Sequence, residues 1–261
     1  MRFAHASAWA EAVFHVLAHV DVGRIASSCH DASWIAWAEA RLGPAADRAL
    51  AQDVRVIASA LASHDALARA QVLAWLWTDA AGARAATLRD LTQLTDADVA
   101  DAAALKTLRE LGPAAEVLRA AAELELPLLA TLDPFPIEDD AFSTALASVA
   151  RAAPELVRCR VSLARPLPRR GRVHDASIVV GAPGVAGAEI AHVAWQAAHE
   201  ATVGEVARSG RATFEDVERS ALGLLRSRAR RVGLEDAHGR WLTTLDLASL
   251  GPIPDVGDGA E

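Results

Sequence analysis

The sequence predicts a mainly α fold, a multi-helix bundle with a single β-hairpin at about 157–180 inserted before a long histidine-bearing helix. Three observations support this class. Alanine, the strongest helix former, supplies a large part of the 52% hydrophobic content. Apolar residues recur at helical spacing along most of the chain, and one stretch shows the two-residue period of a strand. Glycines and Gly-Pro pairs separate the helical stretches.

The chain of 261 residues is long enough to bury a sizeable core. We expect residues 1–250 to form a single helical domain, because no flexible linker separates its halves. An acidic, proline-broken loop at 131–140 is where a division into two lobes would fall. Residues 251–261 contain glycines, prolines and only acidic charges, which predicts a disordered acidic tail.

The helical pattern is interrupted at identifiable stop signals. Gly23 follows the first amphipathic stretch, and Gly43-Pro44 follows the second. Gly233 follows the last long stretch, and residues 241–250 are ambiguous. The predicted helices span 8–22, 31–42, 45–79 with a break near 63–65, 84–93, 95–111, 113–126, a short segment ending near 153, 189–205 and 213–233.

Alternation of apolar and polar residues marks the β-hairpin. In residues 157–163 every second residue is apolar, which is the period of a strand with one buried face. The proline- and arginine-rich segment 166–171 makes the predicted turn, and 173–180 forms the predicted returning strand. A hairpin is marginally stable alone in water, so it must pack on helices or pair with another strand.

Net charge and cysteine content narrow the function classes. The formal charge of −8 argues against a general nucleic-acid-binding protein. Cys29 and Cys159 are far apart and form no CxxC pair, which fits buried thiols in a reducing compartment. No run of about 18 uncharged apolar residues occurs, so we expect no membrane span. With a bacterial-like, alanine- and arginine-rich composition, these features predict a cytoplasmic protein.

The helix predicted at 189–205 carries the densest set of chemically useful side chains. Glu189, His192, Gln196 and His199 follow one another at steps of three or four residues, so they share one face of the helix. Such a stripe provides imidazole and carboxylate groups for metal binding or acid–base chemistry. Core histidines bonded to a carbonyl or a carboxylate are the alternative explanation of the same pattern.

A second stripe lies on the first predicted helix, where Glu11, His15 and His19 are four residues apart. If the two helices pack together, their histidines converge, and helical bundles hold metal ions with inward-facing side chains in this way. Imidazole and carboxylate ligands suit zinc or iron. The predicted ligands of this divalent metal are His15, His19, His192, His199 and Glu189.

The sequence His199-Glu200-Ala201-Thr202 follows the predicted hairpin on the second of these helices. This order resembles zinc metallopeptidases of the HExxH type, which place an edge strand before the helix that holds His, Glu and His. The resemblance implies that His199 is a metal ligand and that Glu200 is the general base acting on metal-bound water. Val203 occupies the position of the second histidine, so another residue would have to complete the site.

His64-Asp65, inside a helical stretch, gives a second resemblance, to metal-dependent phosphohydrolases of the HD type. Those enzymes need a further upstream histidine and a downstream aspartate, for which His30 and either Asp79 or Asp90 are available. The glycine that usually follows the pair is absent here. A helix cap formed by Asp65 or Ser63 is the alternative.

Two function classes follow from these patterns. The first is a metal-dependent enzyme, most simply a hydrolase of a small molecule or peptide; a non-haem iron oxidative enzyme would use the same residue types. The second is a non-catalytic helical interaction protein that docks a partner protein through its hairpin and arginines. A solvated face is the simpler explanation of the arginines. The candidates for anion or partner binding are Arg165, Arg170 and Arg172 near the hairpin tip, and Arg226 and Arg230 on the last long helix.

Overall fold

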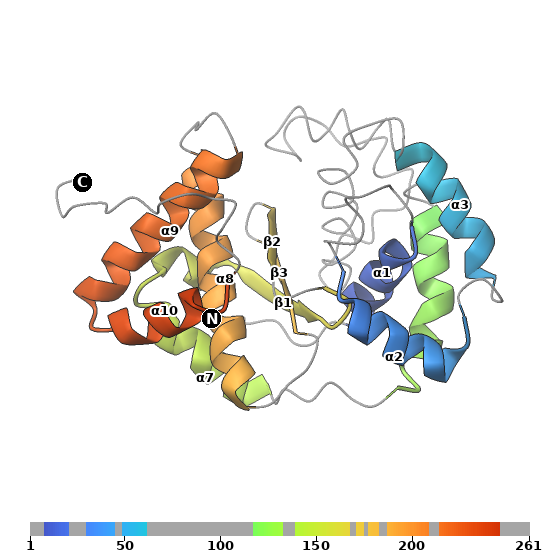
Figure 1. Cartoon of the computed structure of the whole chain (residues 1–261), viewed down its shortest axis with the longest axis horizontal. Coiled ribbons are helices and arrows are strands. Elements are labelled where there is room, and N and C mark those ends of the chain that lie inside the picture. Colours follow the sequence, from blue (N-terminus) through green and yellow to red (C-terminus); the bar gives the residue numbers. More distant parts are fainter. Residues whose placement is uncertain are drawn as a thin grey trace.

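The computed structural model of the protein places helices on both sides of a small sheet (Figure 1). Predictions that fall between the described ranges, including the helices at 84–93 and 95–111 and the tail at 251–261, lie outside the described residues. The structure describes residues 8–20, 30–44, 49–61, 117–132, 139–167, 171–174, 177–182, 187–208 and 214–245.

Helices account for most of the described residues, which confirms the mainly α class with a small β insertion. The first half of the chain contributes α1 (Ala8–Ala18), α2 (Ala32–Leu42), α3 (Leu50–Leu61) and a helix over residues 117–129. The second half contributes α7 (Asp139–Val149), the 3-10 helix η3 (Pro154–Arg158), α8 (Gly187–Arg208), α9 (Phe214–Arg231) and α10 (Glu235–Leu242).

The β insertion is a three-stranded sheet of β1 (Arg160–Ala164), β2 (Gly171–His174) and β3 (Ser177–Gly181), in the order β1-β3-β2. β2 and β3 are antiparallel, with His174 opposite Ser177, and they form the hairpin. β1 pairs in parallel with the other side of β3. The hairpin therefore lies entirely after residue 170.

The predicted pairing of 157–163 with 173–180 as antiparallel neighbours is corrected by this register. The stretch 171–181 reads Gly-Arg-Val-His-Asp-Ala-Ser-Ile-Val-Val-Gly, and aspartate, which stands between its two strands, is a residue type that favours a reversal of the chain. Only two residues separate the paired His174 and Ser177. β3 thereby becomes the central strand, with β1 and β2 hydrogen-bonded to its two edges.

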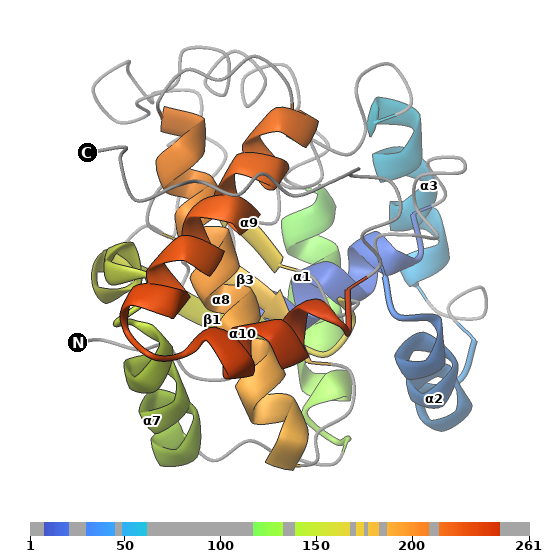
Figure 2. The same cartoon turned by 60° about the vertical axis from the view of Figure 1, so that its left-hand side comes forward.

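Both faces of the sheet are covered by helices (Figures 1 and 2). The N-terminal core consists of the buried apolar residues between Ala10 and Leu132, joined by Ala164, Leu167 and Val179. The C-terminal core consists of the buried apolar residues between Phe142 and Trp241, and includes Val161, Leu163, Ile178 and Val180 of the strands. Successive strand residues point to opposite faces, so one sheet supplies side chains to both cores.

α8 is the central helix of the C-terminal core. Its residues from His192 to Val203 are all buried, because the sheet, α7, α9 and α10 surround it. The helix predicted at 189–205 is thus confirmed, and it extends further at both ends. None of the helices in the described part of the chain is both long and apolar enough to span a bilayer.

The ends of α2 show how local sequence sets a helix boundary. Asp31 lies at the N-cap, and its side chain accepts a hydrogen bond from the backbone N of Trp34 at 2.7 Å. Gly43 ends the helix with a φ of 82°, which favours glycine, and its N–H donates to the Glu39 carbonyl at 2.9 Å. The Asp31 amide also donates to the Pro166 carbonyl at 2.8 Å, which ties α2 to the segment after β1.

The C-terminal region contains a helix that the sequence patterns did not predict. Gly233, with a φ of 74°, follows α9 at the predicted stop. α10 then begins at Glu235, and acidic residues in its first turn suit the positive end of a helix dipole. His238 and Trp241 of α10 are buried against α8, so this short helix completes the C-terminal core.

Candidate functional site

Several of the predicted site residues belong to two clusters of buried and half-buried polar side chains, one on each side of the sheet. The His15 cluster consists of Glu11, His15, His19, Glu39, Glu125 and Arg165. The His199 cluster consists of Gln196, His199, Glu200 and Glu218. The first lies among the helices of the N-terminal core, and the second lies where α8 meets α9.

In the His15 cluster each histidine faces its own carboxylate. His15 is 0% exposed, and its Nε2 lies 3.2 Å from Oε2 of Glu125 on the 117–129 helix. Its ring packs edge-on against His19 and Trp34, with ring centres 4.7 and 5.5 Å away. Nδ1 of His19 lies 3.7 Å from Oε1 of Glu39. His15 therefore joins α1 to the 117–129 helix, and His19, just after the end of α1, lies beside α2.

Glu11 and Arg165 form a buried two-pronged ion pair between α1 and the end of β1. The Arg165 Nε donates to Oε1 of Glu11 at 2.6 Å, and Nη2 donates to Oε2 at 2.9 Å. The guanidinium carbon also lies 5.8 and 6.0 Å from the ring centres of Trp34 and Trp37. Arg165, an anion- or partner-binding candidate, is thus engaged by a carboxylate inside the protein.

In the His199 cluster one imidazole lies between two carboxylates. His199 Nε2 is 2.9 Å from Oε2 of Glu218 on α9, close enough for an ion pair although it is not an aligned hydrogen bond. The Gln196 amide donates to Oε1 of Glu200 at 2.9 Å and lies 3.5 Å from Nδ1 of His199. That Nδ1 is itself 3.8 Å from Oε1 of Glu200. The ion pair of this cluster therefore links α8 to α9.

The pKa values of two histidines near this contact are shifted in opposite directions. Burial on its own lowers the pKa of His199, but the carboxylates of Glu200 and Glu218 outweigh it and raise the pKa to about 10. At neutral pH this ring is an imidazolium. Burial, reinforced by the positive charge of His199, lowers the pKa of His238 to about 4, so that ring is neutral. Both lie against Trp241, with ring centres 5.7 and 5.5 Å away.

Glu200 lies directly against the backbone of the edge strand. A Cβ at Gly171 on β2 would fall 2.3 Å from Cγ of Glu200, so the contact requires glycine. β2 is at the edge of the sheet, and β3 precedes α8 in the chain. Val203, one turn beyond His199, is buried with Val206 of α8 and residues of α9. An edge strand therefore lies beside the helix that carries His199-Glu200, and an apolar residue occupies position 203.

The structure does not bring the two histidine stripes together. His192 belongs to the C-terminal side, where its Nδ1 lies 3.0 Å from Oγ1 of Thr244, whereas the α1 histidines lie in the N-terminal core. Across the described ranges no three His, Cys, Asp or Glu side chains are grouped as metal ligands. Glu189 belongs to α8, but its side chain lies outside the described residues.

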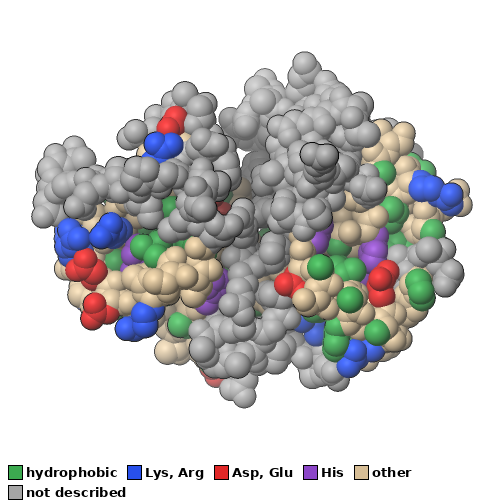
Figure 3. Space-filling view, in the orientation of Figure 1, with side chains coloured by type: hydrophobic (Ala, Val, Ile, Leu, Met, Phe, Trp, Pro, Cys, Tyr) green, Lys and Arg blue, Asp and Glu red, His purple; other side chains and the backbone are tan. Residues whose placement is uncertain are grey.

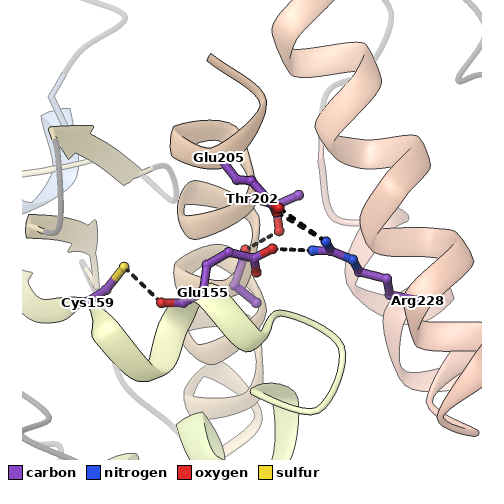
Figure 4. Close-up of polar contacts among 6 residues, drawn as sticks. Glu155, Cys159, Thr202, Glu205 and Arg228 are labelled. Atoms are coloured by element: carbon purple, nitrogen blue, oxygen red, sulfur yellow. Dashed lines mark hydrogen bonds and ion pairs between the residues drawn. The ribbon is translucent and has the colours of Figure 1, made fainter. Parts of the chain in front are cut away.

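Arg228 of α9 is engaged by two carboxylates of the same core (Figure 4). Its guanidinium contacts Glu155 of η3, and its Nη2 lies 3.2 Å from Oε2 of Glu205 on α8. Burial raises the pKa of Glu155. This arginine links η3, α8 and α9, so its role is structural.

The remaining predicted arginines differ in their accessibility. Arg230 is exposed and pairs with Glu235 at 3.1 Å, and Arg226 is half-buried. Basic and acidic side chains lie next to one another over this end of the molecule (Figure 3). Arg170 and the side chain of Arg172 lie outside the described residues.

The HD-type resemblance falls on His64-Asp65, which lie outside the described residues. Another His-Asp pair, His30-Asp31, is described, and its aspartate caps α2. Capping therefore accounts for the aspartate of that pair.

Two carboxylates that complete the clusters, Glu125 and Glu218, are not among the residues that the sequence patterns predict. Glu125 is 3% exposed on a helix whose neighbouring residues are mostly Ala and Leu, and an acid in such a stretch is a usable signal of a buried partner. Glu218 stands among other charged residues of α9, so no local pattern distinguishes it.

Comparison with protein-family models, curated proteins and solved structures finds no match for this chain. The function is therefore inferred from the geometry of the two clusters and the surface of the described residues.

Proposed function

We propose that the protein is a non-catalytic helical interaction protein that binds a partner protein, and that the His199 cluster is an internal fastening between α8 and α9. The observation that carries this proposal is the 2.9 Å ion pair between His199 and Glu218, together with an apolar residue, Val203, where the HExxH arrangement needs its second histidine.

Catalytic zinc sites use three protein ligands and one open position for water. His199 and Glu218 are two groups of ligand type, and position 203 adds a buried methyl-bearing side chain instead of a third. Glu200, the implied general base, accepts from Gln196 and packs on the strand at Gly171. These residues do not fit a zinc site of that kind.

The partner surface that this proposal favours is the C-terminal end of α9. Arg230 and Arg231 are exposed there, and guanidinium groups suit an acidic partner surface; Arg230 also forms an exposed pair with Glu235 at 3.1 Å. Arg165 does not contribute, because Glu11 engages its guanidinium inside the N-terminal core.

Elemental analysis of the full-length protein tests the first part of the proposal, that the protein holds no catalytic metal. The protein is purified without chelator and measured before and after incubation with zinc and ferrous iron. We expect no stoichiometric metal under either condition. One equivalent of metal that is lost in His199→Ala and Glu218→Gln, but kept in the control His238→Asn, would overturn the proposal.

Cross-linking of the tagged full-length protein in an extract of its own cells tests the interaction half. We expect reproducible cross-links between one partner protein and the end of α9, reduced in the double variant Arg230→Ala/Arg231→Ala. Arg55→Ala, an exposed arginine of α3, is the matched control and should leave them unchanged. Cross-links that are equally strong in all three proteins would contradict this docking surface.

A metal-dependent hydrolase is the second candidate, favoured by one observation. His199 and Glu218 are zinc-type ligands on neighbouring helices, and Glu200 adjoins them as a possible base. This function requires a further ligand, and it predicts the stoichiometric metal that the first proposal does not.

A further inference from the structure

Position 203 faces the part of α9 that carries Glu218. Val203 follows His199 by four residues on α8, so the two side chains lie on the same face of the helix. It is 7% exposed and packs in one cluster with Val217 and Ala221 of α9, which flank Glu218 in the sequence. A side chain at position 203 is therefore directed to the same turn of α9 that His199 contacts.

His199 and Glu218 are already spaced almost as two ligands of one ion. Their Nε2 and Oε2 atoms are 2.9 Å apart, and the side chains are 5% and 17% exposed. Two tetrahedral zinc ligands, each about 2.0–2.2 Å from the metal, lie roughly 3.3 Å from one another. The separation of these two atoms differs by a few tenths of an ångström from that of a ligand pair, and zinc binding would also release the imidazolium proton of His199.

We propose that the α8–α9 contact is one donor short of a zinc site, and that Val203 is the residue that keeps zinc out. Histidine or cysteine at position 203 would complete three protein ligands, two from successive turns of α8 and one from α9. Sets of this size, with water in the fourth position, bind zinc in proteins. The inference goes beyond the proposed interaction function, because it assigns metal exclusion to a single side chain.

The test measures zinc binding by the full-length variants Val203→His and Val203→Cys, in competition with a chromogenic chelator. We expect each to bind one equivalent of zinc at least about 100-fold more tightly than the unchanged protein. Cysteine is close to valine in size and provides a thiolate ligand, so it covers the case in which imidazole is too large for the site.

Val206→His is the matched control for burial and composition. Val206 lies in the same apolar cluster and is 8% exposed, but it is seven residues from His199, about 10 Å along the helix axis. A histidine there cannot share an ion with His199 and Glu218, so this variant should bind zinc no better than the unchanged protein. Adding His199→Ala or Glu218→Gln to either position-203 variant should abolish its binding.

Zinc binding can also be measured through stability, because a metal that binds only the native site stabilises the folded protein. The melting temperature of the position-203 variants should rise with zinc, and a variant that is unfolded without zinc should fold when zinc is added. The inference is overturned if neither variant gains zinc binding or zinc-dependent folding, or if the binding survives His199→Ala. That failure leaves the proposed function intact, whereas tight zinc binding by the unchanged protein would overturn both.

Discussion

At the scale of single residues, the C-terminal core holds one charged and one neutral histidine against the same indole ring. His199 is flanked by Glu200 and Glu218, and its pKa is raised to about 10 despite burial. The stability it contributes is present below its unfolded pKa of 6.5 and is lost as the pH rises toward 10. Burial lowers the pKa of His238 to about 4, so its linkage has the opposite sign. Carboxylate neighbours, rather than depth, decide which of the two is charged.

His238 predicts a loss of stability in mild acid. Below pH 6.5 the unfolded chain binds a proton at this residue that the folded protein does not take up until about pH 4. Between pH 7 and pH 5 this costs about 2 kcal/mol of unfolding free energy. Urea unfolding of His238→Gln at both pH values should therefore show a smaller decrease than the unchanged protein. Equal decreases in the two proteins would show that His238 does not carry this linkage.

At the scale of elements, α8 packs between the edge strand and α9. A glycine on the strand leaves room for one of its side chains, and an arginine on α9 pairs with one of its carboxylates. Gly171 of β2 leaves room for the Glu200 side chain, whose Oε1 accepts a hydrogen bond from Gln196 of the same helix. On the opposite side, Arg228 of α9 reaches Glu205. The position of α8 therefore depends on close approach at β2 in addition to apolar burial.

Gly171→Ala tests this close approach. The new Cβ would overlap Cγ of Glu200 at 2.3 Å, and overpacking of this kind costs about 1–3 kcal/mol of unfolding free energy. Gly239→Ala in α10 is the control, because nothing lies within 4 Å of its added Cβ and alanine stabilises a helix by up to about 1 kcal/mol. Chemical denaturation measures both. The Gly171→Ala loss should shrink when Glu200→Ala is added, and a loss of the same size would place the clash elsewhere.

At the scale of the whole molecule, the sheet and one ion pair join the two cores. Residues of β1 and β3 alternate between the N-terminal and C-terminal cores, so neither core is complete without the sheet. Glu11 and Arg165, 154 positions apart in sequence, link α1 to the end of β1. Their side chains are buried, at 7% and 9% exposure, so each charge depends on the other.

Removing one partner of this pair should be costly, and removing both should cost less. Glu11→Met or Arg165→Met alone leaves a buried charge unpaired, which costs roughly 3–5 kcal/mol of unfolding free energy. The double variant Glu11→Met/Arg165→Met removes both charges and should recover part of that loss. Urea unfolding of the three variants gives the coupling free energy. Single and double losses that simply add would mean that the pair is not coupled.

Helix positions and boundaries follow from residues close together in sequence. Asp31 and Gly43 mark the ends of α2, and Gly233 follows α9, because caps and stops act within a few residues of a helix end. Spacing along one helix likewise places His192, Gln196 and His199 on one face of α8. α10 was missed because its eight residues form too short a pattern to distinguish helix from loop.

The sequence by itself determined the mainly helical class, the long α8 and the placement of its chemically useful residues, because these depend on periodicity over three or four positions. Only the tertiary structure decided that β1 pairs in parallel with β3, that His199 meets Glu218, and that His15 and His19 face Glu125 and Glu39 on other helices. Such contacts join residues distant in sequence, and their free energy depends on burial and on the opposing charge. No local pattern records either quantity.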